Sequence, residues 1–384
     1  MFLRKFTLII IAVMLCGFVL KMEAQTTSVF TSGLSQPSKV ILTPSGNLLV
    51  TETMPMPNSG RVSIIDRHGN RRTLIDGLPS GMDPDGLSGP QGLDLNGRTL
   101  FVAIGNGDGT LAGPIQGTEI PNFHPSSPIL SSVLAIHFSA NVEMKTQGFS
   151  LTLADHVTMA NGGVVTLSNG SGETIIVFLL ADFPNFVPDP IPPFPANVRH
   201  SNPFGLGVSG GDVYVADGGM NNVVKVNIAT RNTQTLTTFP PRPNPLPFGP
   251  PFIDAVPDGI RIIRGELLVP LLTGFPFAAG LSEVRRVDLA TGNSTTFIGG
   301  RSSAIDIVEG NPFHSPTQYY VLEFSSDFLV DAPGQLLSFS SPMASPTVVA
   351  GGLISPSGMV RDAATGDIYI TEIFTGNILR VSFP

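Results

Sequence analysis

The feature that most constrains the fold of this chain is a repeat that links its two ends. The segment 28–38, SVFTSGLSQPS, returns as TVVAGGLISPS at 347–357, a constant offset of 319 residues. The proline of this segment precedes a short apolar run. An equivalent position, which we call a slot, recurs along the chain. The slots are Pro37, Pro90, Pro203, Pro257, Ser302 and Pro356. Four of the steps between slots span 45 to 54 residues, and the step of 113 is interpreted as one repeat plus about 60 further residues.

Repeats of this length that hold four short strands each are typical of propeller blades. Each slot except Pro37 is followed by a small residue two positions later, and every slot leads into apolar residues, a glycine-containing turn and a second strand with period-two alternation. The composition agrees, because 42 Gly and 35 Pro punctuate the chain while charged residues reach only 13%. The sequence therefore predicts an all-β, six-bladed β-propeller that forms a single domain over residues 25–384. Its second strands are expected at 47–51, 99–103, 212–216, 266–270, 318–322 and 367–371.

The chain ends predict how the ring closes. The strand 28–32 comes before the first slot, and the C-terminus stops after a third strand near 377–381. We expect these two strands to pair in antiparallel fashion, which leaves no free edge between the first and last blades. Residues 141–172 exceed the period, and their runs 149–154 and 163–167 predict a β-hairpin insertion on blade 2 that the ring does not need in order to fold.

The first 24 residues are predicted to be a cleaved export signal. Arg4 and Lys5 precede an apolar run of about 15 residues, too short to span a bilayer, and Ala24 offers a cleavage site. An uncleaved anchor is the alternative. Cleavage would remove Cys16, the only cysteine, and leave a formal net charge of −10. We expect a periplasmic or secreted protein without disulfides or a stable membrane anchor.

Repeated acids mark one face of the predicted ring. The loops after the second and fourth strands of every blade open on the same side, which is called here the ligand face. Four second strands end at a carboxylate, at Glu52, Asp217, Glu323 and Glu372. These acids would either form a ring of oxygen ligands for a cation or cap their own loops by accepting backbone N–H bonds.

Other ligand-face residues could bind a cation or an apolar molecule. Asp83 and Asp85, and Asn106 and Asp108, lie in short Asp-Gly loops that offer oxygen ligands for Ca²⁺ but lack the spacing of an EF-hand. Thr273-Gly274-Phe275-Pro276-Phe277 places two rings in a loop, where they would stack on a planar ligand or plug the ring.

The six histidines lack the spacing of a zinc site and are expected to be mainly surface or loop residues. They are His68, His124, His137, His156, His200 and His314. His200 is singled out because, with Asn202, it enters an inner strand from the ligand face. The formal charge of −8 argues against nucleic-acid binding. The sequence has no P-loop, and no glycine-rich string is expected to lead from a strand into a helix, as a nucleophile elbow or a dinucleotide fingerprint requires, which argues against a serine hydrolase or a nucleotide enzyme.

Four strings resemble one family of bacterial proteins. SNPFG at 201–205, VYVADGG at 213–219, LTGFPF at 272–277 and YVLEF at 320–324 are similar, in order and spacing, to the ScyD/ScyE family of exported β-propellers. The resemblance runs from about Thr27 to the C-terminus and implies an NHL/SMP-30-like propeller. Members mostly lack an assigned reaction, so it implies a fold more than an activity. The insertion and the bulky Lys39 depart from the simple pattern.

Two classes of function follow from these features. The first is a non-enzymatic binding or scaffold protein with an acidic, Ca²⁺-binding ligand face that holds a small molecule or a protein. The second is a metal-dependent hydrolase or lyase of the lactonase type, in which a metal activates water. No residue stands out as catalytic.

Overall fold

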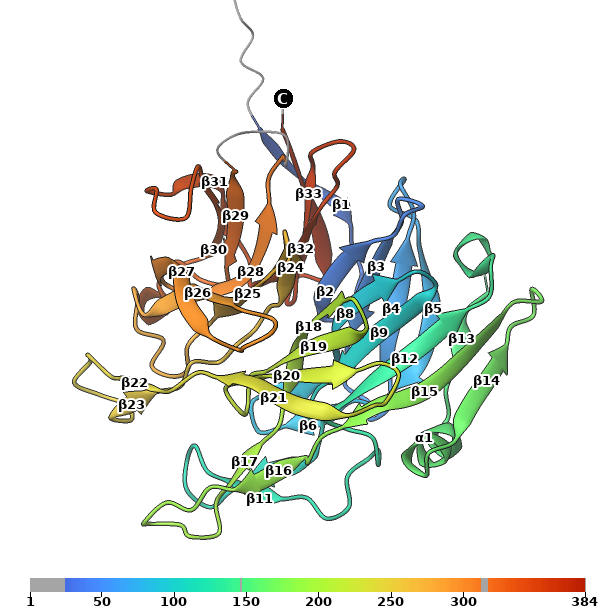
Figure 1. Cartoon of the computed structure of the whole chain (residues 1–384), viewed down its shortest axis with the longest axis horizontal. Helices are drawn as coiled ribbons and strands as arrows, with labels where there is room; N and C mark the ends of the chain where they lie inside the picture. The colour runs from blue at the N-terminus through green and yellow to red at the C-terminus, as the bar shows by residue number, and fades with distance from the viewer. Residues whose placement is uncertain (1–24, 146, 312–316, 384) are drawn as a thin grey trace, which may run out of the picture.

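Six antiparallel sheets surround a central axis, as the slots predicted (Figure 1). The computed structural model describes residues 25–145, 147–311 and 317–383; the predicted signal, residues 1–24, and His314 lie outside them. The innermost strands of blades 1 to 6 are β2 (Pro37–Leu42), β8 (Pro90–Asn96), β18 (Pro203–Ser209), β24 (Arg261–Ile263), β28 (Ala304–Glu309) and β32 (Pro356–Arg361). The second strands are β3 (Leu48–Glu52), β9 (Thr99–Ile104), β19 (Asp212–Asp217), β25 (Glu266–Leu271), β29 (Tyr319–Glu323) and β33 (Ile368–Glu372).

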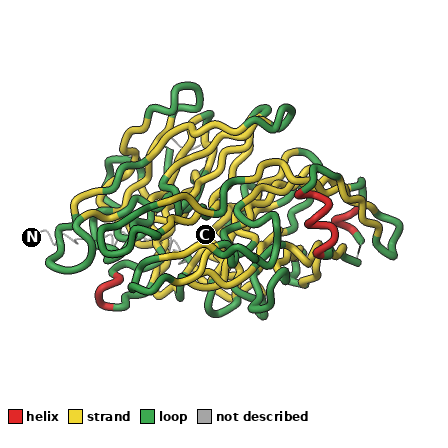
Figure 2. Tube along the Cα trace, turned by 90° about the horizontal axis from the view of Figure 1, so that it is seen from below, coloured by secondary structure: helices red, strands yellow, loops and turns green. Residues whose placement is uncertain are grey.

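The outer half of each blade holds the third and fourth strands. The third strands are β4 (Gly60–Ile65), β12 (Ser132–Phe138), β20 (Asn222–Asn227), β26 (Ser282–Val287), β30 (Gly334–Phe339) and β34 (Asn377–Ser382). The fourth strands are β5 (Arg71–Leu78), β15 (Thr174–Asp182), β21 (Thr233–Thr238), β27 (Ser294–Arg301), β31 (Thr347–Leu353) and β1 (Thr26–Thr31). Strands dominate the described residues, which contain one α-helix, and the few helical segments lie away from the middle of the molecule (Figure 2). No helix in the described ranges has the length and hydropathy to span a membrane.

In four blades the glycine two positions after the slot lets neighbouring blades approach closely. A Cβ at Gly259 would lie 2.6 Å from the carbonyl oxygen of Ile305, and one at Gly358 would lie 3.0 Å from that of Ser38. Gly92 and Gly205 meet the backbone of the next blade in the same way. Glycine is thus required wherever two inner strands cross without room for a side chain.

One slot was misplaced by two residues. Ala304 pairs with Glu323 as Pro37 pairs with Glu52, so Ala304, not Ser302, opens blade 5. Ser302 belongs to the turn before it, where its backbone N–H donates to Glu323 Oε1 at 3.0 Å.

The predicted closure of the ring is confirmed. β1 pairs with β34 in antiparallel register, with Ser28 opposite Arg380 and Val29 opposite Leu379. The last sheet therefore has the order β1-β34-β33-β32 and contains both ends of the described chain.

The insertion is more than a hairpin. It contains η1 (Val142–Met144), β13 (Phe149–Ser150), α1 (Leu153–Ala160) and β14 (Val164–Ser168). β14 pairs with β15 and extends blade 2, whereas β13 pairs in parallel with β5 of blade 1. The strand expected at 149–154 is wrong in its second half, because Thr152 and Asp155 form a capping box that starts α1.

The insertion also belongs to the core. Val142, Phe149, Leu151 and Met159 are buried in the hydrophobic cluster shared by blades 1 and 2. The expectation that the ring folds equally well without residues 141–172 is therefore revised, since removing them would expose this cluster to water.

Four short hairpins stand on the ligand face. They connect β6 (Gly81–Asp83) with β7 (Gly86–Ser88), β10 (Thr110–Ala112) with β11 (Glu119–Pro121), β16 (Phe186–Pro188) with β17 (Val198–His200), and β22 (Arg242–Pro243) with β23 (Phe252–Ile253). They all belong to loops after second or fourth strands, so they enlarge the face on which the sequence placed its candidate residues. In Figure 1, β6, β11, β16 and β17 lie together, and β22 and β23 project from the ring at a separate place.

Candidate functional site

The four acids that end second strands are buried and bonded within their own blades. Glu52 Oε2 accepts from the backbone N–H of Ser35 at 2.7 Å and from Arg71 Nη2 at 2.9 Å. Glu372 Oε1 accepts from the N–H of Ile354 at 2.7 Å, and its Oε2 accepts from Thr375 Oγ1 at 2.8 Å. These contacts are those of loop caps.

Asp217 and Glu323 follow the same pattern. Asp217 Oδ1 accepts from the backbone N–H groups of Asn202 and Met220 at 2.8 and 3.0 Å. Glu323 Oε1 accepts from the N–H of Ser302, and Oε2 accepts from Gln335 Nε2 at 2.7 Å. In this geometry each acid fixes the approach to an inner strand, and the hydrogen bonds within its own blade occupy its oxygens.

Three ligand-face loops bring a different set of metal-ligating groups together. One ligand atom each of Asp85, Glu119 and His200 lies within 4.8 Å of the other two. Asp85 is in the turn between β6 and β7, Glu119 begins β11, and His200 ends β17. We call these three residues the acid–histidine cluster.

Hydrogen bonding leaves part of the acid–histidine cluster unsatisfied. His200 Nδ1 lies 2.7 Å from Glu119 Oε1. Glu119 Oε2 is buried and has no hydrogen-bond partner among the described residues. A buried carboxylate oxygen without a donor is costly, so this atom calls for a cation or a donor that the protein itself does not provide.

The charges around His200 favour a positive charge. Burial lowers the pKa of His200, but the hydrogen bond to Glu119 and the charges of Glu119, Asp83 and Asp85 outweigh it, so the pKa is raised overall. Burial raises the pKa of Asp83 to about 6, although the charge of His200 and two backbone N–H groups oppose the rise. Asp83 Oδ1 accepts from the backbone N–H groups of Asp85 and Gly86 at 2.8 and 2.9 Å, so Asp83 shapes the turn that presents Asp85.

The second predicted Ca²⁺ loop is used differently. Asp108 accepts from the backbone N–H and the hydroxyl of Ser126, at 2.9 and 2.8 Å to Oδ1. Asn106 is fully buried, and its Nδ2 donates to Thr110 Oγ1 at 2.9 Å. Neither residue belongs to the acid–histidine cluster. The Oδ1 atoms of Asn106 and Asn202 are buried, without a partner in the described part of the chain.

The two phenylalanines of the TGFPF segment differ in exposure, and their rings meet edge to face with centroids 6.4 Å apart. Phe277 stacks on Phe328 with ring centroids 4.4 Å apart, and Phe328 in turn stacks on Phe324. The side chain of Phe275 is 59% exposed. Phe277 therefore packs between loops, as a plug would, while Phe275 is free to contact a ligand.

The central axis is closed by charged side chains from inner strands. Lys39 Nζ contacts Asp258 Oδ1 across the ring and donates to the carbonyl oxygen of Ser357 at 2.7 Å. Arg261 pairs with Asp306 at 2.7 Å. The cavity that remains between the described residues here is about 10 Å³, room for about one water molecule. This cavity is too small to hold an organic ligand.

Sequence reasoning missed Glu119, Lys39 as an ion-pair partner, and one buried histidine. Glu119 sits in the unremarkable string TEIP, and only the fold of two distant hairpins brings it to His200. His156 is fully buried instead of lying at the surface, because Nε2 contacts the carbonyl oxygen of Gly77 at 2.8 Å and Nδ1 contacts Ser127 Oγ at 3.0 Å.

Comparison with known proteins supports the fold alone. The sequence matches no known protein family and no curated protein. A solved auxiliary nutrient-binding protein from Bacteroides thetaiotaomicron is similar with a TM-score of 0.51 and 10% identity, over 93% of this chain and 76% of that one. An oxidoreductase from Thermus thermophilus, named as a glucose dehydrogenase, is similar with a TM-score of 0.50 and 12% identity, over 93% of this chain and 100% of that one. At such identity the likeness shows the propeller architecture.

Proposed function

We propose that this chain is an exported propeller of the ScyD/ScyE type that acts as a binding protein and holds a divalent cation in the acid–histidine cluster. The observation that carries the proposal is the convergence of Asp85, Glu119 and His200 from three separate loops. Ligand atoms on opposite sides of one ion are about 4–5 Å apart, because metal–ligand distances are about 2.0–2.6 Å. The spacing of the cluster therefore suits a single ion.

The donor set favours a transition metal over Ca²⁺. Ca²⁺ takes six to eight oxygen ligands, whereas an imidazole nitrogen beside two carboxylates suits Zn²⁺, Mn²⁺ or Fe²⁺. The metal would displace the proton between His200 and Glu119, so binding would weaken as the pH falls. Ca²⁺, which the sequence predicts, is therefore tested beside the transition metals.

The proposal is tested by melting the protein with Zn²⁺, Mn²⁺, Ca²⁺ or EDTA. An ion that binds only the folded state stabilises it by about 2.7 kcal/mol at a hundredfold excess over its dissociation constant. We expect Zn²⁺ or Mn²⁺ to raise the melting temperature more than Ca²⁺ and His200→Ala to abolish the rise. His124→Ala, an exposed histidine of the same face, is the matched control. Identical curves in metal and in EDTA would overturn the proposal.

Solvent access to the acid–histidine cluster favours a second candidate, the metal-dependent hydrolase or lyase. Asp85 is exposed, while Glu119 and His200 are half-buried, so three protein ligands would leave a coordination position open to water or substrate. A lactone-hydrolysis screen separates the candidates: activity that EDTA and His200→Ala both remove supports the enzyme, and cation binding without turnover supports the binding protein. N-terminal sequencing of the expressed protein tests export, since cleavage after Ala24 is expected.

A further inference from the structure

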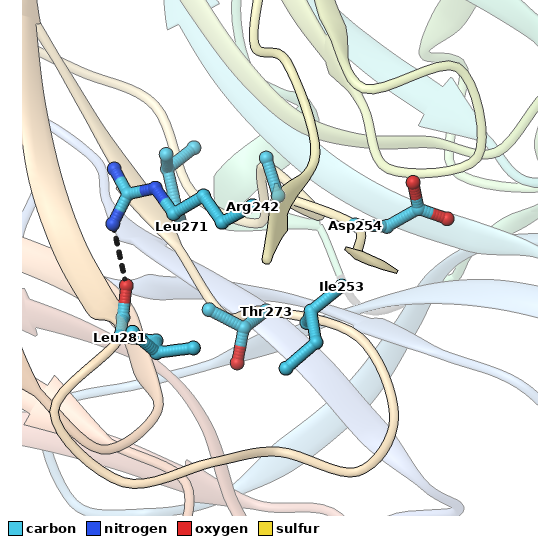
Figure 3. A pocket seen from close by; sticks show the side chains of 7 residues that line it. Arg242, Ile253, Asp254, Leu271, Thr273 and Leu281 are labelled. Atoms are coloured by element: carbon cyan, nitrogen blue, oxygen red, sulfur yellow. Dashed lines mark hydrogen bonds between the residues drawn. The ribbon is translucent and has the colours of Figure 1, made fainter. Parts of the chain in front are cut away.

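A small pocket opens on the ligand face at blade 4. It lies between β23, the end of β25 and the loop that follows β25. Its walls are mainly apolar, from Ile253, Leu271 and Leu281, and its polar groups come from Thr273, Arg242 and Asp254 (Figure 3). The cavity is about 10 Å³, space for about one oxygen atom of a larger molecule.

Thr273 is the unusual residue of this pocket. Its side chain is buried, with 3% exposed, and Oγ1 has no hydrogen-bond partner among the described residues. Its backbone has a φ of +76°, a region that a β-branched residue rarely adopts. The N–H of Thr273 donates to the carbonyl oxygen of Ala255 at 3.1 Å, which holds the residue in place. Backbone strain and a hydroxyl without a hydrogen-bond partner, both at one buried residue, are typical of a ligand-binding residue.

The charged groups of the pocket already have partners. Arg242 Nη1 donates to the carbonyl oxygen of Leu281 at 2.8 Å, and Nη2 pairs with Glu283. Asp254 accepts from Asn221 Nδ2 at 2.8 Å and pairs with Arg199 at 3.0 Å. The Thr273 hydroxyl is therefore the polar group that this pocket offers to a ligand, and it suits an uncharged partner.

Two exposed phenylalanines are close in sequence to residues of the pocket. Phe275 follows Thr273 by two residues, and Phe252, next to the pocket residue Ile253, is 58% exposed. The loop between β22 and β23 lies against Phe275, since a Cβ at Gly249 would meet its Cε1 at 3.2 Å. Phenylalanine faces of this kind favour offset stacking with a flat apolar molecule.

We propose that this pocket is a binding subsite for a flat, apolar molecule that carries one uncharged hydroxyl. The hydroxyl enters the pocket and bonds to Thr273 Oγ1, and the flat body lies on Phe275. This site is separate from the acid–histidine cluster, so it goes beyond the proposed cation binding and does not depend on it.

The experiment measures the affinity of 2-naphthol, naphthalene and 2-naphthoate by ligand fluorescence, which the chain disturbs little because it has no Trp and only four Tyr. We expect wild-type protein to bind 2-naphthol more tightly than the other two. Thr273→Val removes the hydroxyl at nearly constant shape and should weaken 2-naphthol about fivefold to tenfold, the value of one net hydrogen bond, while leaving naphthalene unchanged. Phe275→Ala should weaken both neutral probes.

Controls separate this site from general surface binding. Phe123→Ala removes another exposed phenylalanine of the ligand face and should change nothing. Thr273→Ser retains the hydroxyl and should keep the preference for 2-naphthol, even if Thr273→Val lowers the melting temperature. Added EDTA should also leave the affinity intact, so failure of the cation proposal is distinguishable. The inference is overturned if 2-naphthol does not bind, if Thr273→Val is without effect, if Phe275→Ala matches Phe123→Ala, or if 2-naphthoate binds more tightly.

Discussion

Lys39 introduces a buried charge near the central axis, where most blades have glycine. Four blades have glycine two positions after the slot, at Gly92, Gly205, Gly259 and Gly358. Blade 1 has Lys39, whose ammonium group reaches Asp258 of blade 4 and lies 4.9 Å from the ring centroid of Phe204 of blade 3. Burial raises the pKa of Asp258 to about 6, although the charge and hydrogen bond of Lys39 oppose the rise.

Lys39→Met should therefore destabilise the ring in a pH-dependent way. At pH 8 the variant must either bury the Asp258 carboxylate without its partner or protonate it, and removing one partner of a buried pair costs about 3–5 kcal/mol. Without Lys39 the pKa of Asp258 rises further, so the folded state takes up a proton as the pH falls. Because a raised acid pKa stabilises the folded state at low pH, the loss should be smaller at pH 5 than at pH 8.

Urea denaturation at the two pH values measures this effect. Lys39→Met combined with Asp258→Asn removes the unpaired charge and should recover part of the free energy of unfolding at pH 8. A Lys39→Met variant as stable as wild type, or equally destabilised at both pH values, would contradict the role of this pair.

At the scale of elements, strand positions were predictable and inserted loops were not. The second strand 212–216 was expected from its alternation and is observed at Asp212–Asp217. The run 149–154 was apolar enough to suggest a strand, but the capping box of Thr152 and Asp155 determined a helix instead. Alternation reports local burial, whereas the acid–histidine cluster depends on how three hairpins fold over one another. Sequence therefore suggested His200 and Asp85 without their partner Glu119.

We expect the insertion to stabilise the folded protein, in part through the contacts of one buried histidine. His156 on α1 links the helix to Gly77 of blade 1 and to Ser127 of blade 2. His156→Ala would remove the histidine partner of the Gly77 carbonyl and one of the two partners of the Ser127 hydroxyl, and would open space in the core, at a cost of about 2–4 kcal/mol. Thermal unfolding measures the loss, and exposed His68→Ala is the control. Deletion of residues 141–172 should cost more still, and a fully stable deletion variant would contradict this account.

The whole molecule concentrates its binding potential on one face. β17 lies between the two candidate sites, since the side chain of Arg199 pairs with Asp254 of the blade 4 pocket while that of His200 contacts Glu119. Adjacent residues of a strand point to opposite sides, so one short strand serves both sites. The proposed cation site requires the ring below to hold its three loops in fixed relation, so ring closure would support that site.

Ring closure leads to the last prediction, a truncation that removes residues 1–33. β34 would become an open edge, and the contact of Phe30 with Tyr369, with ring centroids 4.9 Å apart, would be lost. Burial of one ring and the ladder bonds of one strand together are worth about 3–6 kcal/mol. Because the inner strands of blades 1 and 6 pack on each other, the variant should unfold in a single transition at lower temperature, measured by calorimetry.

A peptide of residues 25–33 should restore the melting temperature by adding a strand to β34, and a scrambled peptide should not. A separate early transition confined to blade 6, or a truncated protein as stable as the full chain, would show that the terminal strand merely covers an edge. A single transition restored by the peptide would show that β1 couples all six blades, and with them the three loops that position the acid–histidine cluster.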